Sequence, residues 1–186
     1  MADLIIKPST GGSLKLQEDG GTDAISINTS GVATLANATI TAGTFPAGMV
    51  IQTVTASLAA QSGAITATDY TRRDNMTAQI TNVKSGNKVN VRMNFNFYID
   101  MGDTADGGSC CIYRENTIIS SHTGGHQYYV SNADLAIYID AVQDFTDASP
   151  AVGTNNYYLG MRAYSNCSVA METGGKFNII LQEIQG

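Results

Sequence analysis

Residues 88–100 read KVNVRMNFNFYID, which is the clearest structural pattern in this sequence. Every second position carries an apolar side chain: Val89, Val91, Met93, Phe95, Phe97 and Ile99. On an extended chain these residues share one face, and the polar positions between them share the other. A helix would spread the same residues around its whole circumference. The pattern therefore predicts a long antiparallel strand with one side in a hydrophobic core.

The regions on either side of this strand predict further strands joined by turns. The sequence KSGN at 84–87 suits a hairpin turn between residues 77–83 and 88–100. Downstream, apolar or alternating runs predict strands at 111–119 (two strands and a tight turn), 128–130, 135–140, 157–164 and 177–184. The last run is apolar on both faces, which predicts a central strand or a subunit contact.

Loops are expected between these strands, at residues 144–154 and at residues 59–74 apart from a short strand near Ile65. About eight strands with no helical period between them predict an all-β fold. The expected architecture is an antiparallel β-sandwich, jelly-roll-like in its connections.

The sequence changes character at residues 43–48, which read GTFPAG. No Phe or Tyr precedes Phe45, and the earlier residues are mostly small and polar. Such a segment cannot build a core alone, whereas the roughly 140 residues after it match the usual size of a domain. We therefore expect an N-terminal β-rich stem at residues 1–46 and a sandwich head at residues 47–186.

The stem contains short runs with paired aliphatic residues, at 13–17, 24–28, 32–35 and 38–41. Each run offers one narrow apolar edge, which is too little to stabilise a monomer. Three copies side by side would bury these edges around a shared axis. The residues expected at this trimer interface are Leu14, Leu16, Ile25, Ile27, Val32, Leu35 and Ile40. A flexible linker is the alternative, although a Gly/Ser linker would not need recurring aliphatic pairs.

The charge balance limits the class of partner. The chain has 10 Lys and Arg against 16 Asp and Glu, and the scattered basic residues argue against a nucleic-acid partner.

Other features limit where the protein is made and how it is held together. The sequence contains no run of about 18 apolar residues, so no membrane-spanning helix is predicted. The N-terminus lacks a basic segment followed by an apolar one, so synthesis in a cytoplasm is expected. The three cysteines have neither zinc spacing nor a disulfide framework, and we expect small buried side chains.

The chain resembles bacteriophage virion fibre and head-decoration proteins. The resemblance lies in the stem, which ends in TLANATITAGTFPAGMVIQTV, and in the head segments SGNKVNVRMNFNFYI, CIYRENTII, NNYYLGMRAY and KFNIILQEI. It implies a homotrimer on the particle surface, bound to other capsid or tail proteins, with a jelly-roll head and no catalysis of its own. The short N-terminal region favours a small fibre, knob or decoration protein made in the host cytoplasm.

Two alternatives stay open. In a receptor-binding tail fibre, the head loops expected at 100–109, 120–127 and 144–156 would bind a host glycan or surface protein. A trimeric tumour necrosis factor-like or lectin-type binding module is the other.

Few residues suggest a chemical site. Tyr128 and Tyr157 are candidates for facing a receptor, because Tyr has a flat apolar ring with a polar rim, although core packing or a trimer contact is the favoured interpretation. His122 and His126 could gather a metal at a trimer axis, and the oxygen-rich stretch Asp100–Asp106 could bind calcium. A glycine-interrupted loop and a solvated acidic turn are the favoured explanations of these features. We therefore expect no metal, no cofactor and no enzymatic activity.

Overall fold

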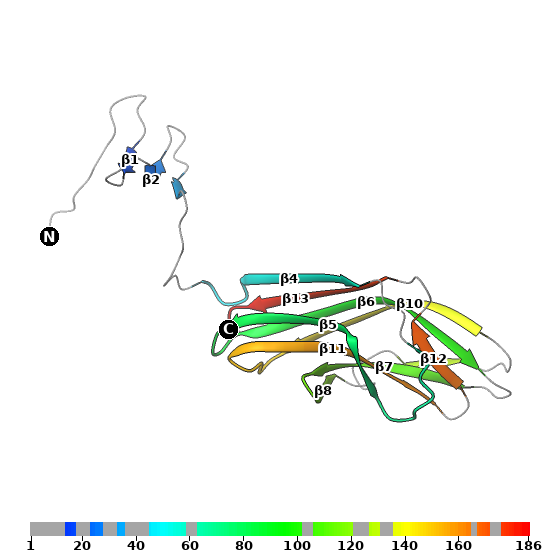
Figure 1. Cartoon of the computed structure of the whole chain (residues 1–186). Helices are drawn as coiled ribbons and strands as arrows, with labels where there is room; N and C mark the ends of the chain where they lie inside the picture. Colours follow the sequence, from blue (N-terminus) through cyan, green and yellow to red (C-terminus); the bar gives the residue numbers. More distant parts are fainter. Residues whose placement is uncertain are drawn as a thin grey trace. The chain divides into compact units, whose positions relative to one another are not determined.

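A computed structural model of the chain describes residues 14–17, 23–27, 33–35, 45–58, 63–101, 106–120, 127–130, 136–164, 167–171 and 176–186 (Figure 1). The chain divides into two compact units, Met1–Thr44 and Phe45–Gly186. The division falls between Thr44 and Phe45, where the sequence analysis placed it between Pro46 and Ala47. Within the described ranges there is no helix that could span a membrane.

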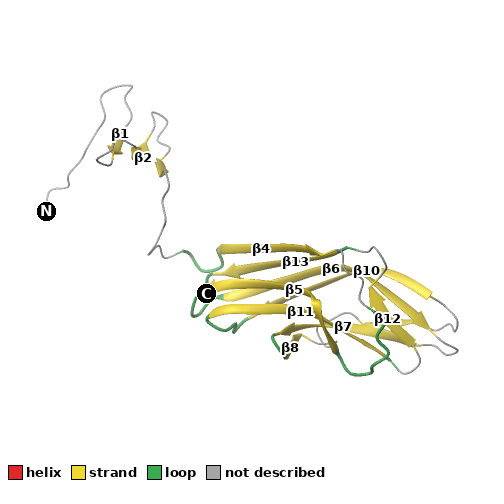
Figure 2. Cartoon of the chain, in the orientation of Figure 1, coloured by secondary structure: helices red, strands yellow, loops and turns green. Residues whose placement is uncertain are grey.

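The second unit is a sandwich of two antiparallel sheets (Figure 2). The first sheet contains, in order, β10 (Ala136–Asp147), β6 (Lys88–Met101), β13 (Phe177–Ile184) and β4 (Val50–Leu58), and β12 (Cys167–Met171) also pairs with β6. The second sheet contains β5 (Thr71–Val83), β11 (Gly153–Ala163), β7 (Asp106–Arg114) and β8 (Thr117–Ser120), and β9 (Gln127–Val130) also pairs with β7. The predictions of an all-β fold and a β-sandwich are confirmed.

The hydrophobic core lies between the two sheets and follows the alternation seen in the sequence. All six apolar residues of β6 named above are buried, and they pack with residues of both sheets such as Ile80, Leu159 and Phe177. Phe95 contacts Phe97 edge-on at 6.3 Å between ring centroids. Strand β13 lies between β6 and β4, which confirms the prediction of a central strand.

The turn at residues 84–87 connects the two sheets, so the predicted hairpin is wrong. Val83 at the end of β5 pairs with Gly153, whereas Val89 at the start of β6 pairs with Asp147 and Glu183. The two strands lie in different sheets, where β5 packs across the core against β13 and β4, and β6 packs across it against β7. The Glu183 carboxylate holds the turn by accepting hydrogen bonds from the Lys84 amide (2.8 Å) and from Asn87 Nδ2 (2.7 Å).

Several strands extend beyond the boundaries expected from the sequence. The loop predicted at 144–154 is wrong in part, because β10 continues to Asp147 and β11 begins at Gly153. Strand β5 begins at Thr71, inside the expected loop at 59–74, while Ile65 forms an isolated bridge with Val169. Polar residues stay in these strands because their backbone groups complete the ladders.

The first unit contains a three-stranded antiparallel meander of β1 (Leu14–Gln17), β2 (Asp23–Ile27) and β3 (Ala33–Leu35). Its register pairs aliphatic positions: Leu14 with Ile27, Leu16 with Ile25, and Ile25 with Leu35. Val32 and Ile40, which were expected at the trimer interface, lie outside the described residues.

Candidate functional site

The outer face of the first sheet carries a row of residues that crosses all four main strands. The register aligns Val142 of β10 with Asn94 of β6, Asn94 with Asn178 of β13, and Asn178 with Ser57 of β4. Alternate residues of each strand point into the core, so these four side chains share the solvent face. Side chains from four segments far apart in the sequence thus come together on one surface.

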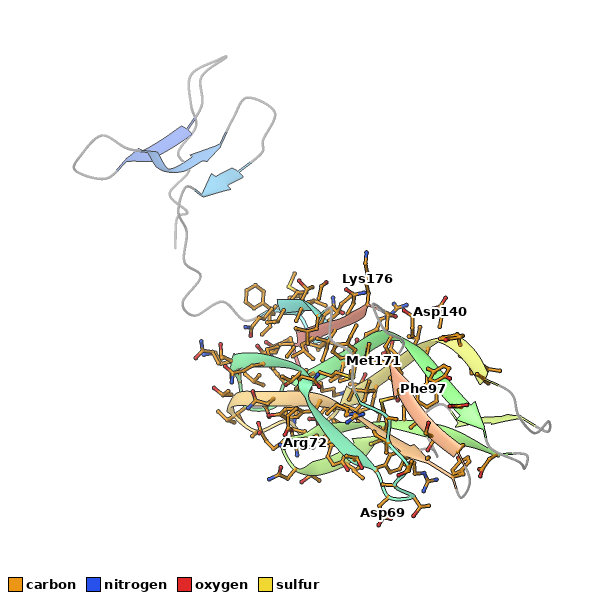
Figure 3. All side chains as sticks on the ribbon, turned by 45° about the vertical axis from the view of Figure 1, so that its right-hand side comes forward. Asp69, Arg72, Phe97, Asp140, Met171 and Lys176 are labelled. Carbon is orange, nitrogen blue, oxygen red and sulfur yellow. The ribbon has the colours of Figure 1, made fainter. Side chains whose placement is uncertain are left out.

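Two adjoining hollows lie along this row. One, of about 220 Å³, is lined by Asn94, Phe95, Asn96, Asp140, Ala141, Val142, Lys176 and Asn178. The other, of about 370 Å³, is lined by Ser57, Leu58, Lys176 and Asn178. Because the hollows share Lys176 and Asn178, we treat them as one feature, the polar groove. Figure 3 shows Lys176 and Asp140 projecting from this face, and Arg72 and Asp69 on the opposite side of the sandwich.

The polar groove is only partly satisfied by its own hydrogen bonds. Ser57 Oγ donates to Asn178 Oδ1 at 2.6 Å, and Asn96 Nδ2 donates to Asp140 Oδ1. Among the described residues, the side-chain amide of Asn94 and the ammonium of Lys176 have no hydrogen-bond partner. The groove therefore presents both donors and acceptors to solvent.

An aromatic pair stands beside the polar groove, two residues along the same strands. Tyr98 of β6 pairs in register with Tyr138 of β10, and their ring centroids are 4.8 Å apart at a tilt of 36°. The side of the pair formed by Tyr138 is open, since this residue is 62% exposed. The pair forms a flat apolar platform with polar hydroxyl tips.

The outer face of the second sheet carries a tyrosine–arginine cluster. Arg72 stacks over the Tyr158 ring at 4.3 Å, and Arg162 stacks over the Tyr70 ring at 4.7 Å. The polar atoms of this cluster are largely paired within the chain: Arg162 Nε donates to Ser109 Oγ, and Arg72 donates to Asp74 and Asn116.

Tyr157 does not face solvent, so the prediction that it faces a receptor is wrong. It is 0% exposed, and its hydroxyl donates to Asp147 Oδ2 at 2.9 Å. Arg114 Nη1 donates to the same carboxylate oxygen at 2.7 Å, which ties β7, β10 and β11 together. Burial, followed by the hydrogen bond to Asp147, raises the pKa of the Tyr157 hydroxyl well above its ordinary value.

The other predicted receptor and metal residues fall largely outside what the structure describes. For Tyr128 only the backbone is described, in β9, where it pairs with Gly108. His122, His126 and Asp103 lie outside the described residues. Within the described part of the chain, no group of three or more His, Cys, Asp or Glu is arranged to hold a metal.

Two of the expected receptor loops are partly strand. Residues 106–109 belong to β7 and are buried, and Asp106 accepts a hydrogen bond from the Gly107 amide at 2.9 Å. Residues 144–147 and 153–156 likewise belong to β10 and β11. These segments are held by ladder hydrogen bonds, so the prediction of loops there is wrong.

All three cysteines are free and buried, which confirms the expectation for them. Cys110 packs in the core between the sheets, while its neighbour Cys111 points to the opposite face. Burial raises the pKa of the Cys111 thiol to about 12.

Sequence reasoning missed the polar groove, although one signal for it was present. The outward positions Asn90, Asn94 and Asn96 of β6 are amides, where a purely solvated face commonly carries Lys or Glu. Repeated Asn on the exposed side of a strand points to a surface used for hydrogen bonding. The contributions of β4, β10 and β13 could not be seen without the strand order.

Comparisons with known proteins leave the family of this chain open. No family model matches it, and a search of curated proteins finds no match. Among solved structures, it is similar to dimeric latent PorU from Porphyromonas gingivalis, at 10% identity and a TM-score of 0.35. The alignment covers 82% of this chain and 15% of that chain, and a likeness at this level carries no argument about function.

Proposed function

We propose that this chain is a non-enzymatic structural protein of a bacteriophage particle, a homotrimeric short fibre, knob or decoration protein. It is made in the host cytoplasm, assembles with other capsid or tail proteins, and is displayed on the particle surface. The proposal combines the sequence resemblance with two structural observations, one in each unit.

The observation that carries the proposal is the register of the first unit. Strands β1, β2 and β3 have four, five and three residues and bring Leu14, Leu16, Ile25, Ile27 and Leu35 into direct cross-strand pairs. A meander this short cannot bury enough apolar area to be stable alone. Association of identical copies would supply the missing area, and a threefold arrangement matches the expected stem.

The strand order of the head supports a jelly-roll-like display domain. In chain order, β4, β5, β6 and β7 alternate between the two sheets, and β10, β11 and β13 alternate again. The resulting orders, β10-β6-β13-β4 and β5-β11-β7-β8, support the proposed jelly-roll-like connections, an architecture common in viral capsid and lectin domains.

The entry of the chain into the head also suits an attached domain. The Gly48 amide donates to the Gln185 carbonyl at 2.8 Å, and the Gln185 amide donates to the Met49 carbonyl at 2.9 Å. Chain entry and C-terminus are therefore joined at one end of the sandwich.

Native mass spectrometry of the full-length protein tests the association directly. We expect a trimer at micromolar concentration, and Leu16→Ser, which removes an aliphatic side chain from the paired set, should shift the population to monomer. Thr53→Ala, an exposed change on β4, is the matched control and should remain trimeric. A wild-type protein that is only monomeric would refute the proposal. Antibody labelling of intact particles in the electron microscope would then show whether the protein is on the capsid or the tail.

A further inference from the structure

We propose that the polar groove on the outer face of the first sheet binds a neutral oligosaccharide, with Tyr98 and Tyr138 stacking against one sugar ring. The site is formed by Asn94, Asn96, Asp140, Lys176, Asn178 and Ser57. It lies on the sheet face, away from the inter-strand loops, and it is independent of whether the protein trimerises.

The shape of the groove suits an extended ligand. Its residues follow the register from Val142 through Asn94 and Asn178 to Ser57, across four neighbouring strands. At roughly 4.8 Å between strands, this row spans about 14 Å. A chain of a few sugar units can lie along such a row, whereas a single small molecule would occupy only one of the two hollows.

The hydrogen-bonding chemistry suits hydroxyl groups. A sugar hydroxyl both donates and accepts, and a side-chain amide offers an acceptor oxygen next to two donor protons. Asn94 has no partner among the described residues, and the Asn178 nitrogen remains available because Ser57 uses only its oxygen. Asp140 is oriented by Asn96 and keeps acceptor capacity for a pair of adjacent hydroxyls.

The charge of the groove favours a neutral ligand. Its lining contains one carboxylate, Asp140, and one ammonium, Lys176, which balance each other. On the same face, Asp144, which Asn90 binds, pairs in register with the exposed Arg92, so these two nearby charges also balance. An anionic ligand such as a sialylated glycan or a nucleic acid would gain no net attraction from these balanced charges and would be repelled by the net charge of −6 of the chain.

The aromatic pair supplies the apolar contact that polar side chains cannot. Tyr138 is 62% exposed and lies two positions before Asp140, on the same side of β10. Its ring is supported from one side by Tyr98 at 4.8 Å, so that the stack is already in place before a ligand arrives. The C–H face of a pyranose ring can pack on such a surface.

The test uses the full-length protein on an array of immobilised oligosaccharides. The array contains neutral chains of glucose, galactose, mannose and N-acetylhexosamines, together with sialylated and sulfated glycans. We expect binding to neutral chains of at least three units, and titration calorimetry with the best neutral ligand then measures the affinity.

Three variants locate the site. Asn94→Ala and Tyr138→Ala should each weaken binding about fivefold to tenfold, because each removes one hydrogen-bonding or stacking contact. Thr53→Ala, exposed on β4 of the same face but outside the groove, should leave the affinity within about twofold of wild type. Of these two substitutions, Tyr138→Ala is less disruptive to folding, because the Tyr138 side chain is largely exposed. Melting temperatures of all variants confirm that they are folded.

Three results would overturn the proposal: no neutral glycan bound, a preference for acidic glycans, or equal affinity of wild type and both groove variants. Native mass spectrometry of the same preparation reports the oligomer separately. A trimer without glycan binding refutes only the groove, and a monomer that binds refutes only the proposed assembly.

Discussion

Removing one buried hydroxyl should measurably weaken the head. Tyr157→Phe deletes the hydrogen bond from the Tyr157 hydroxyl to Asp147 Oδ2 and leaves the ring in the core. A hydrogen bond to a charged group contributes about 1.5–3 kcal/mol. The Asp147 carboxylate keeps Arg114 at 2.7 Å and the Ser149 amide at 3.2 Å, so we expect the lower end, a loss of about 1.5 kcal/mol.

The assay is urea denaturation followed by circular dichroism at one fixed protein concentration, since association changes apparent stability. A loss of about 1.5 kcal/mol corresponds to a fall in Tm of about 3–6 °C for a chain of this size. Tyr158→Phe is the matched control, because the Tyr158 hydroxyl has no hydrogen-bond partner among the described residues. Its free energy of unfolding should change by less than about 0.5 kcal/mol. Equal effects of the two substitutions would refute the role given to the Asp147 network.

The stabilities of wild type and Tyr157→Phe should also depend on pH in different ways. The folded-state pKa of Tyr157 lies above its unfolded value of 10.0, because burial and the hydrogen bond to Asp147 favour the neutral hydroxyl. A raised pKa contributes stability that is complete below pH 10 and is lost as the pH rises further. The difference in unfolding free energy between wild type and Tyr157→Phe should therefore shrink above pH 10. A difference that grows with pH would contradict this sign.

Three further predictions concern other parts of the molecule. Gly160→Ala should destabilise the head by about 1–3 kcal/mol in urea denaturation, because the added Cβ would clash with Cys111 Sγ and with the Tyr113 ring. Gly63→Ala is the control, because a Cβ added there would have no atom within 4 Å. The Cys111 thiol, whose pKa is raised to about 12 from 9.0, should react with a thiol reagent at pH 8 only after unfolding, and its contribution to stability should be lost between about pH 9 and 12. Fast labelling of Cys111 in the native protein would show that it is accessible. In the stem, Leu16→Ser should abolish the trimer in native mass spectra without lowering the Tm of the head, and a trimer that persists would exclude Leu16 from the interface.

Residues 88–100 show how far the sequence alone predicts the fold. An extended chain places alternate side chains on opposite faces whatever its neighbours are, so the six apolar residues of this segment had to share one side. The same local reasoning identified β13 as a central strand and the cysteines as buried. These features depend on residue type and period, and both can be read from the chain.

Pairing between strands could not be predicted in this way. The turn at 84–87 has the composition of a hairpin turn, yet β5 and β6 lie in different sheets, because each strand buries its apolar residues against strands of the opposite sheet. Tyr157 was a candidate for the surface because it belongs to the adjacent pair Tyr157–Tyr158, whose side chains point to opposite faces of a strand. Its place was decided by Asp147 and Arg114, which come from two other strands.

The sequence by itself determined that this protein is all β, that its Phe and Tyr residues begin at Phe45, and that the long strand at residues 88–100 buries one face. These properties follow from side-chain period and composition, which are local. Only the tertiary structure decided that Asn94, Asn178, Asp140 and Ser57 form one groove, since the register of four strands brings them together. Residues that are distant along the chain become neighbours only when the sheet order is set, and that order depends on how all the apolar faces pack at once.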